Sequence, residues 1–246
     1  LYRVMEYRVQ VHYYFTLSKE YIAKILRIGL PSAFEQILYQ GCQIVFLYYV
    51  TYLGAESLAA RQYAVNISMF TYLFAIAIGM GTAIIVGRLV GASEKEEAYK
   101  SVWFSVKWAV IFTVTMVTIV IVLRYPLMGL FTDNKEIIEI GASVLLLRFL
   151  LETGRTINIV IINSLRAAGD ATFPVFVGAL SMVMMSLPLG YFLIFVLDLG
   201  LVGVWLAIAA DEWTRATIMF FRWKSRRWEK FALIQPSKGE DRPRGS

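Results

Sequence analysis

The sequence predicts an all-α, polytopic membrane protein built as a bundle of six transmembrane helices. Six long apolar runs fill most of its 246 residues, and each reaches the roughly 20 apolar helical residues that cross a bilayer. Runs of this length without alternation favour helices, which satisfy their own backbone in lipid. Hydrophobic residues make up 58% of the chain and charged residues 17%, with a mean hydropathy of +0.61. The runs are Ile28–Leu53, Leu58–Gly87, Val102–Leu123, Ile137–Asn163, Phe173–Leu197 and Gly200–Phe221.

The runs divide the chain into three parts. Residues 1–27 are expected to form a cytoplasmic segment with an amphipathic helix capped by Ser18. Residues 28–221 are the predicted six-helix transmembrane lobe, and residues 222–246 are a basic cytoplasmic tail. The chain starts at Leu1 and its first residues lack the apolar core of a signal peptide. We therefore expect a longer protein whose missing part lies upstream.

The connections between the runs carry turn and cap signals. Gly29-Leu30-Pro31 predicts the start of the first span, because proline suits the first turn of a helix. The segment 87–93 closes the second span, and the acidic residues within 94–97 favour a new helix start. Thr132-Asp133-Asn134 is expected to cap the fourth span, and Ala168-Gly169-Asp170 turns the chain into the fifth.

Basic residues favour one side of the predicted bundle. Both ends and two of the inner connections are rich in lysine and arginine, whereas the opposite side has only Arg124 and Lys135. The positive-inside rule then places both ends in the cytoplasm of a plasma-membrane protein. Such clusters at membrane edges are topology signals that also contact anionic lipid, so a nucleic-acid partner is not expected. The basic side holds Arg3, Arg8, Lys19, Lys24, Arg27, Arg88, Lys95, Lys100, Arg166, Arg222, Lys224, Arg226, Arg227 and Lys230.

A polar stripe runs along the first span. Its members, at spacings of three and four, are Glu35, Gln36, Tyr39, Gln40 and Gln43. Glu35 has no cation nearby on its own helix, so it needs a partner elsewhere, a proton or a bound cation. An intramembrane acid favours a functional stripe that binds cation or substrate, and the alternative is a hydrogen-bonded packing stripe.

Charged residues also interrupt the fourth and sixth spans. Glu152 can pair with Arg148 four residues earlier and with Arg155 three residues later. Asp211 and Arg215 form a second pair at i,i+4, which leaves Glu212 to pair with Arg155 or Arg148 across the bundle. These residues are either a charge network that locks the helices together or part of a transport site, with Glu152 and Arg155 as binding candidates.

Other polar and aromatic residues are expected to play structural roles. Arg61 is expected to snorkel to the interface. Tyr63, Tyr72, Trp103 and Trp108 either contact an aromatic or cationic substrate or, as is commoner near helix ends, anchor the chain at the interface. Cys42, the single cysteine, is a packing residue, and His12, the single histidine, is solvated. The chain has no phosphate-binding loop, zinc-binding His-Glu-x-x-His motif or nucleophile elbow. An enzyme, a metal site and an organic cofactor are therefore not expected.

A set of short motifs resembles the second half of the multidrug and toxic compound extrusion (MATE) transporters. Their order and spacing over residues 20–228 carry the resemblance. The motifs are Arg27-Ile28-Gly29-Leu30-Pro31-Ser32, Leu53-Gly54-Ala55-Glu56-Ser57-Leu58-Ala59-Ala60, Gly79-Met80-Gly81-Thr82-Ala83, Val86-Gly87-Arg88-Leu89-Val90-Gly91-Ala92, Ser164-Leu165-Arg166-Ala167-Ala168-Gly169-Asp170-Ala171-Thr172-Phe173-Pro174 and Leu199-Gly200-Leu201-Val202-Gly203-Val204-Trp205.

The resemblance implies one lobe of a twelve-helix transporter, with this chain as helices seven to twelve. It further implies export of organic, cationic or amphipathic compounds by antiport with Na⁺ or H⁺, together with a missing N-terminal six-helix lobe. The acids of some sodium-coupled members correspond here to Tyr39 and Arg155, and the nearest acids are Glu35 and Glu152. The known cation site is therefore not carried over, and these two glutamates are only candidates for its roles.

Two other functions remain open at this stage. Arg148 and Arg155 are compatible with a related flippase of lipid-linked oligosaccharides or an exporter of polysaccharides, which needs a cationic groove for phosphates. A membrane scaffold subunit without transport would use the same charge pairs purely for packing. Ion-gradient-dependent efflux separates the scaffold from both transporters.

Overall fold

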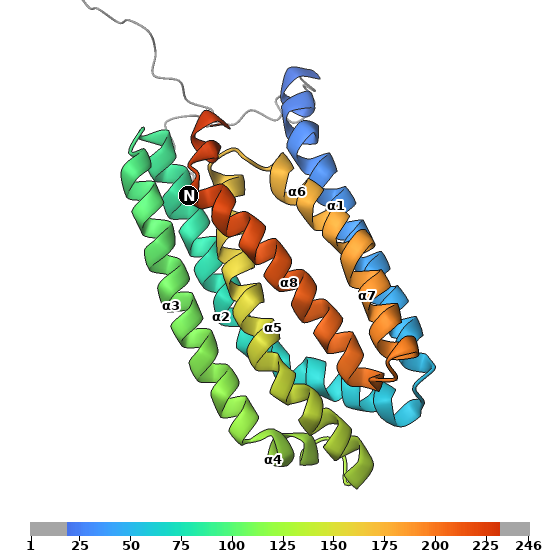
Figure 1. Cartoon of the computed structure of the whole chain (residues 1–246). Coiled ribbons are helices and arrows are strands. Elements are labelled where there is room, and N and C mark those ends of the chain that lie inside the picture. The colour runs from blue at the N-terminus through green and yellow to red at the C-terminus, as the bar shows by residue number, and fades with distance from the viewer. Residues whose placement is uncertain (1–18, 232–246) are drawn as a thin grey trace, which may run out of the picture.

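The computed structural model describes residues 19–231, which are almost entirely helical (Figure 1). Residues 1–18 with the predicted Ser18 cap and His12, and the tail from residue 232, lie outside the described residues. The elements are α1 (Lys19–Thr51), α2 (Ala55–Gly91), α3 (Lys95–Val122), α4 (Arg124–Gly129), α5 (Lys135–Ala167), α6 (Thr172–Ser181), η2 (Met182–Ser186), α7 (Leu187–Tyr191), η3 (Phe192–Val196), α8 (Gly200–Lys224) and η4 (Arg227–Phe231).

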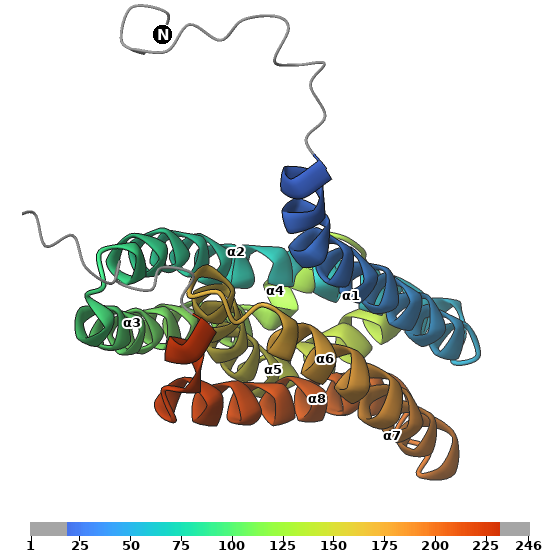
Figure 2. The ribbon, with the colours of Figure 1, turned by 90° about the horizontal axis from the view of Figure 1, so that it is seen from above.

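All six predicted spans are present as helical segments. The first differs in its start, because α1 is one continuous helix of 33 residues that includes Gly29-Leu30-Pro31. A proline inside a helix removes one backbone donor and bends the helix without necessarily ending it. Figure 2 shows the first turns of α1 running in a different direction from the remainder. The amphipathic helix and the first span therefore form one bent helix.

Three helical segments are long and apolar enough to cross a membrane by length and composition alone: Ala55–Gly91, Lys95–Val122 and Thr172–Val196. The other three long helices, α1, α5 and α8, carry the polar and charged residues noted in the sequence. At 37 residues α2 is about 55 Å long, which exceeds the roughly 30 Å hydrocarbon core. Its ends therefore extend beyond the lipid interior.

The helices form two packed groups (Figures 1 and 2). One group has α5 at its centre, with α2, α3 and α8 packed against it. The other pairs α1 with the segment from α6 to η3, which also contacts α8. The start of α1, the α2–α3 turn, the α5–α6 turn and the end of α8 gather at one end of the bundle (Figure 1). That end contains the described basic residues that sequence analysis assigned to one side.

The fifth span contains two π-helical stretches that the sequence did not predict. They are η2 and η3, on either side of α7, whose second residue is Pro188. At the end of η3 the Leu197 N–H donates to the Phe192 carbonyl, five residues earlier, at 3.1 Å. Pro188 has no N–H to donate, and π stretches commonly accommodate such a break in the α-helical pattern.

Two apolar clusters form the core at opposite ends of the bundle. One surrounds Phe46, Leu145 and Trp205, and the other surrounds Ile161 and Trp223. Along α5 and α8 most of the buried polar and charged residues lie between these clusters in the sequence, at positions 152–158 and 211–215, while Arg148 lies among residues of the first cluster. The apolar clusters thus enclose a polar layer in the middle of the helices.

The basic end of the bundle is fixed by ion pairs and aromatic stacking. Buried Asp170, in the turn after α5, accepts from the Arg222 Nε at 2.7 Å. The rings of Trp223 and Trp228 stack in parallel at 4.4 Å, so η4 folds back onto α8. Arg226 donates to Glu96 at 2.6 Å, and this hydrogen bond raises the pKa of the Arg226 guanidinium. The residues after Phe221 that are described therefore belong to the helical body.

Candidate functional site

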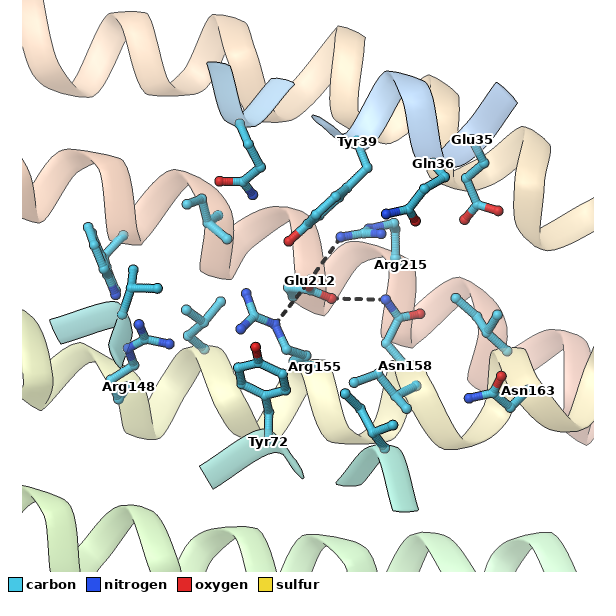
Figure 3. A pocket seen from close by; sticks show the side chains of 18 of the residues that line it. Glu35, Gln36, Tyr39, Tyr72, Arg148, Arg155, Asn158, Asn163, Glu212 and Arg215 are labelled. Carbon is cyan, nitrogen blue, oxygen red and sulfur yellow. Dashed lines mark hydrogen bonds and ion pairs between the residues drawn. The ribbon is translucent and has the colours of Figure 1, made fainter. Parts of the chain in front are cut away.

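A cavity of about 720 Å³ lies between α1, α2, α5 and α8, and Figure 3 shows most of its wall. Its lining includes five arginines and two glutamates, together with aromatic and aliphatic residues. Arg148 lies toward one end of this view, and Glu35 and Asn163 lie toward the other (Figure 3). The polar layer between the two apolar clusters therefore opens onto an internal cavity.

The centre of the site is a network around Glu212. Glu212 of α8 accepts from the Arg155 Nε at 3.2 Å and from the Asn158 Nδ2 at 2.9 Å, both on α5. Arg215 lies 3.2 Å from the same carboxylate (Figure 3). The prediction that Glu212 pairs with Arg155 or Arg148 across the bundle is confirmed for Arg155. Two helices are thereby joined by charge within the bundle interior.

Glu152 lies behind this network and does not line the cavity. Its side chain is 0% exposed, and its Oε1 accepts from Arg148 at 2.5 Å and Arg155 at 3.1 Å. Both predicted pairings are therefore present. The Arg148 guanidinium also lies 5.4 Å from the Trp205 ring and donates to the Ala64 carbonyl at 3.4 Å. Since two arginines already occupy Glu152, it is poorly placed to exchange a cation with the cavity.

Asp211 connects α8 to the start of the first π stretch. It pairs with Arg215 at 2.8 Å, as the i,i+4 spacing predicted, and accepts from Ser181 at the end of α6. A second cavity of about 20 Å³ adjoins Asp211, with Cys42 and Ser186 in its wall. This volume is about that of one water molecule. Cys42 is buried, as expected for a packing residue.

Glu35 finds its partner on another helix. Its Oε2 accepts from the Arg166 Nη2 at 2.5 Å, at the end of α5. Its Oε1 closely approaches α6, because a Cβ at Gly178 would lie 3.1 Å away. Of the three ways to satisfy this acid, the described structure supplies an ion pair. Both side chains are partly exposed, at 13% and 34%, so this pair is more open to the cavity than the pairs of Glu152.

The stripe on α1 reaches the cavity at four of its five predicted positions. Glu35, Gln36, Tyr39 and Gln43 line it, whereas Gln40 is exposed and does not. Successive helical residues turn by about 100°, which places Gln40 roughly 85° from the mean direction of the other four. The prediction that Gln40 belongs to the stripe is therefore wrong. Gln40 is four residues from Gln36, but Gln36 itself lies at the edge of the face, so this spacing carries Gln40 away from the cavity.

Arg61, which is predicted to snorkel to the membrane interface, lines the cavity instead, and so does Tyr72, for which the sequence allowed either an interface anchor or a substrate contact. Arg61 donates to the Gln43 Oε1 at 3.4 Å, and Arg155 lies 5.9 Å from the Tyr72 ring. The sequence did hold a signal for this orientation. Arg61, Val65 and Tyr72 repeat at spacings of four and seven, which is the pattern of one helix face.

Metal binding through a dense ligand cluster is not supported within residues 19–231. No group of three or more His, Cys, Asp or Glu side chains there is arranged to hold a metal ion. Each of the four acids of the site instead forms an ion pair with arginine. Arginine side chains hold carboxylates in place and can also bind acidic groups of a ligand.

Comparison with known proteins gives a family match over residues 31–192, to the family named MatE. The "Uncharacterized transporter YisQ" of Bacillus subtilis is 40% identical over 214 residues, 87% of this chain and 47% of the relative. A "Probable multidrug resistance protein NorM" of Thermotoga maritima is 27% identical, over 86% of this chain and 46% of the relative. The chain spans about half the length of the curated relatives it matches.

Solved structures match at the level of the fold. A MATE crystal structure in the bent conformation superposes with a TM-score of 0.82 at 18% identity, over 95% of this chain and 52% of that one. The Vibrio cholerae MATE transporter VcmN in its bent form gives 0.78 at 21% identity, over 84% of this chain and 47% of its own. The predicted all-α membrane fold is confirmed, and it matches about half the length of these MATE transporter structures.

Proposed function

Because the chain belongs to the MatE family of transporters, we propose that it forms the C-terminal six-helix lobe of a secondary active exporter of organic compounds. A family of transporters also confirms the sequence interpretation that the chain is not an enzyme. A further six-helix lobe would complete the cavity, as the greater length of the relatives supports. Both ends of the chain would lie in the cytoplasm of a cell-membrane protein.

The observation that carries this proposal is the charged cavity within the helices. Charged groups inside a membrane protein are expensive and are found where they pair or line a route. Here five arginines and two glutamates line about 720 Å³ between four helices. A membrane scaffold without transport would use the ion pairs for packing but would not need a cavity of this volume. The excess of arginine favours amphipathic rather than simply cationic substrates.

Glu35 is the acid best placed to take part in coupling to Na⁺ or H⁺. Its side chain retains some exposure and contacts a single arginine, whereas Glu152 is fully enclosed between two. A proton or Na⁺ at Glu35 would compete with Arg166 and so loosen the link between α1 and the end of α5. Since an ion shifts a conformational balance only through different affinities for the two states, this breakable pair supplies the required difference.

The test is Glu35→Gln in the complete transporter, reconstituted in vesicles with an imposed Na⁺ or H⁺ gradient. Loss of gradient-driven efflux of a fluorescent amphipathic substrate is expected, with substrate binding retained. Glu97→Gln is the matched control, because Glu97 is exposed and pairs only with Lys100 among described residues. Unchanged gradient-dependent efflux in Glu35→Gln removes Glu35 from coupling, and absence of efflux from the unmodified protein refutes the exporter.

The arginine-rich lining also favours a second candidate, the flipping of lipid-linked oligosaccharides or export of polysaccharides. Arginine binds phosphate in a bidentate manner, so a phosphate-linked glycan suits the same wall. Growth of cells that lack their own lipid-linked oligosaccharide flippase, restored by the complete protein, would support this candidate over drug export.

A further inference from the structure

The arginines of the cavity form a series along its length. Arg148, Arg155 and Arg166 all lie on α5, and the first and last are 18 positions apart, which is about 27 Å of helix. This distance approaches the roughly 30 Å of a bilayer core. Arg61 of α2 and Arg215 of α8 contribute two further guanidinium groups from the other walls. A positive group is thus present along most of the route that a substrate would take.

The carboxylates around the cavity are fewer than its five arginines. Arg148, Arg155, Arg166 and Arg215 pair with the four acids Glu35, Glu152, Asp211 and Glu212. Arg61 has no carboxylate within 4 Å among the residues that the structure describes. The hydrogen bond that it donates to Gln43 is long, at 3.4 Å, and its acceptor is the oxygen of a neutral amide. Within residues 19–231, five cations facing four anions leave one positive charge, which we assign to Arg61.

An unmatched guanidinium in a cavity within the helix bundle favours an anionic ligand. Burying a charge without a counter-charge is costly, and a bound acid would remove that cost. The planar guanidinium holds a carboxylate, sulfonate or phosphate through paired hydrogen bonds. The same wall offers apolar surface from Val65, Leu151 and Ile208 for the rest of a molecule. A simple organic cation would meet the surplus positive charge instead.

We propose that the cavity takes organic compounds that combine an apolar body with an acidic group, and that Arg61 contacts this acidic group. The inference rests on the proposed export function and narrows its substrate class. Gln43 then positions the Arg61 guanidinium, and the apolar wall holds the body of the substrate. The paired arginines of α5 offer further positive positions when their carboxylates change partners during transport.

Three matched fluorescent probes test this proposal in the complete transporter: dansylglycine, its uncharged methyl ester and the amine dansylcadaverine. Charge-assisted hydrogen bonds favour the acid, so dansylglycine should bind at least about tenfold more tightly than either analogue. Arg61→Gln should abolish this preference, and Arg61→Lys should retain part of it. Lys107→Gln is the control, because it removes an exposed positive charge on α3 away from the cavity and should leave the preference intact.

Equal binding of the three probes, tighter binding of the amine, or an acid preference that survives Arg61→Gln would overturn the proposal. A gradient-driven efflux assay with the same probes separates this failure from failure of the export function. Efflux of the amine alone leaves the exporter standing and refutes the acidic substrate class. Binding of dansylglycine through Arg61 without efflux of any probe supports the site and refutes the exporter.

An acidic group can belong to a free compound or to a lipid headgroup. Repeating the dansylglycine titration in nanodiscs of phosphatidylglycerol and of phosphatidylcholine distinguishes these sources. Arg61-dependent competition by phosphatidylglycerol alone assigns the site to a headgroup, and equal dansylglycine affinity in both lipids assigns it to a free acid. Both results retain the contact between Arg61 and an acidic group, and an affinity independent of Arg61 in both lipids contradicts it.

Discussion

At the scale of single residues, Glu152 has the most enclosed position of the charged network. It is 0% exposed and serves both Arg148 and Arg155 from one oxygen, while its Oε2 has no hydrogen-bond partner among the described residues. The pairs within one helix could be predicted from sequence, because the i,i+3 and i,i+4 geometry is fixed locally. The Glu35–Arg166 pair could not, since it depends on how helices distant in sequence pack, and for the orientation of Arg61 the sequence offered only its spacing with Val65 and Tyr72.

Replacement of Glu152 by glutamine should destabilise the protein. The change leaves Arg148 without a carboxylate partner and removes one of the two carboxylates that pair with Arg155. Breaking a buried ion pair typically lowers the free energy of unfolding by about 3–5 kcal/mol. Denaturant-induced unfolding in detergent micelles measures the loss. Glu139→Gln is the matched control on the same helix, because Glu139 is exposed and should tolerate the change. A Glu152→Gln variant as stable as this control would show that the pairs contribute little.

At the scale of elements, the interrupted fifth span is the main departure from a simple bundle. The sequence identified an apolar run with Pro188, but the π stretches on both sides of α7 follow from hydrogen-bond rearrangement that composition does not encode. Close packing stabilises this irregular segment: Gly203 of α8 lies directly against the backbone of Leu193 in η3. A side chain at position 203 would have its Cβ only 3.0 Å from a backbone carbon.

Gly203→Ala should therefore destabilise the protein, by about 1–3 kcal/mol as for other overpacked sites. Backbone atoms of η3 cannot rotate away as a flexible side chain would. Gly87→Ala provides the comparison, because nothing lies within 4 Å of its added Cβ, and it should be neutral or stabilising by up to about 1 kcal/mol. Thermal unfolding in detergent compares the two. Equal midpoints would indicate that α8 and η3 are not tightly packed at this point.

At the scale of the whole molecule, two apolar clusters and the polar layer between them explain how a lipid-embedded bundle can contain a charged cavity. The apolar runs were sufficient to predict six helices, their alternating directions and the shared end of the basic segments. The cavity itself could be predicted only in part, as a polar stripe on the first span and charges on the fourth and sixth. Which residues of α2 line the cavity depends on the rotation of that helix about its axis. The nearly uniform hydrophobicity of α2 gives little indication of this rotation.

Cysteine accessibility in vesicles tests the central claim most directly, namely that a water-filled charged cavity lies inside a lipid-embedded lobe. In the complete transporter without Cys42, single cysteines replace Ile159 of the cavity wall and Ile111 on the exposed face of α3. A charged, water-soluble methanethiosulfonate reagent should label position 159 and leave position 111 unmodified, because lipid shields the latter. Rapid labelling at position 111 with none at position 159 would contradict the account.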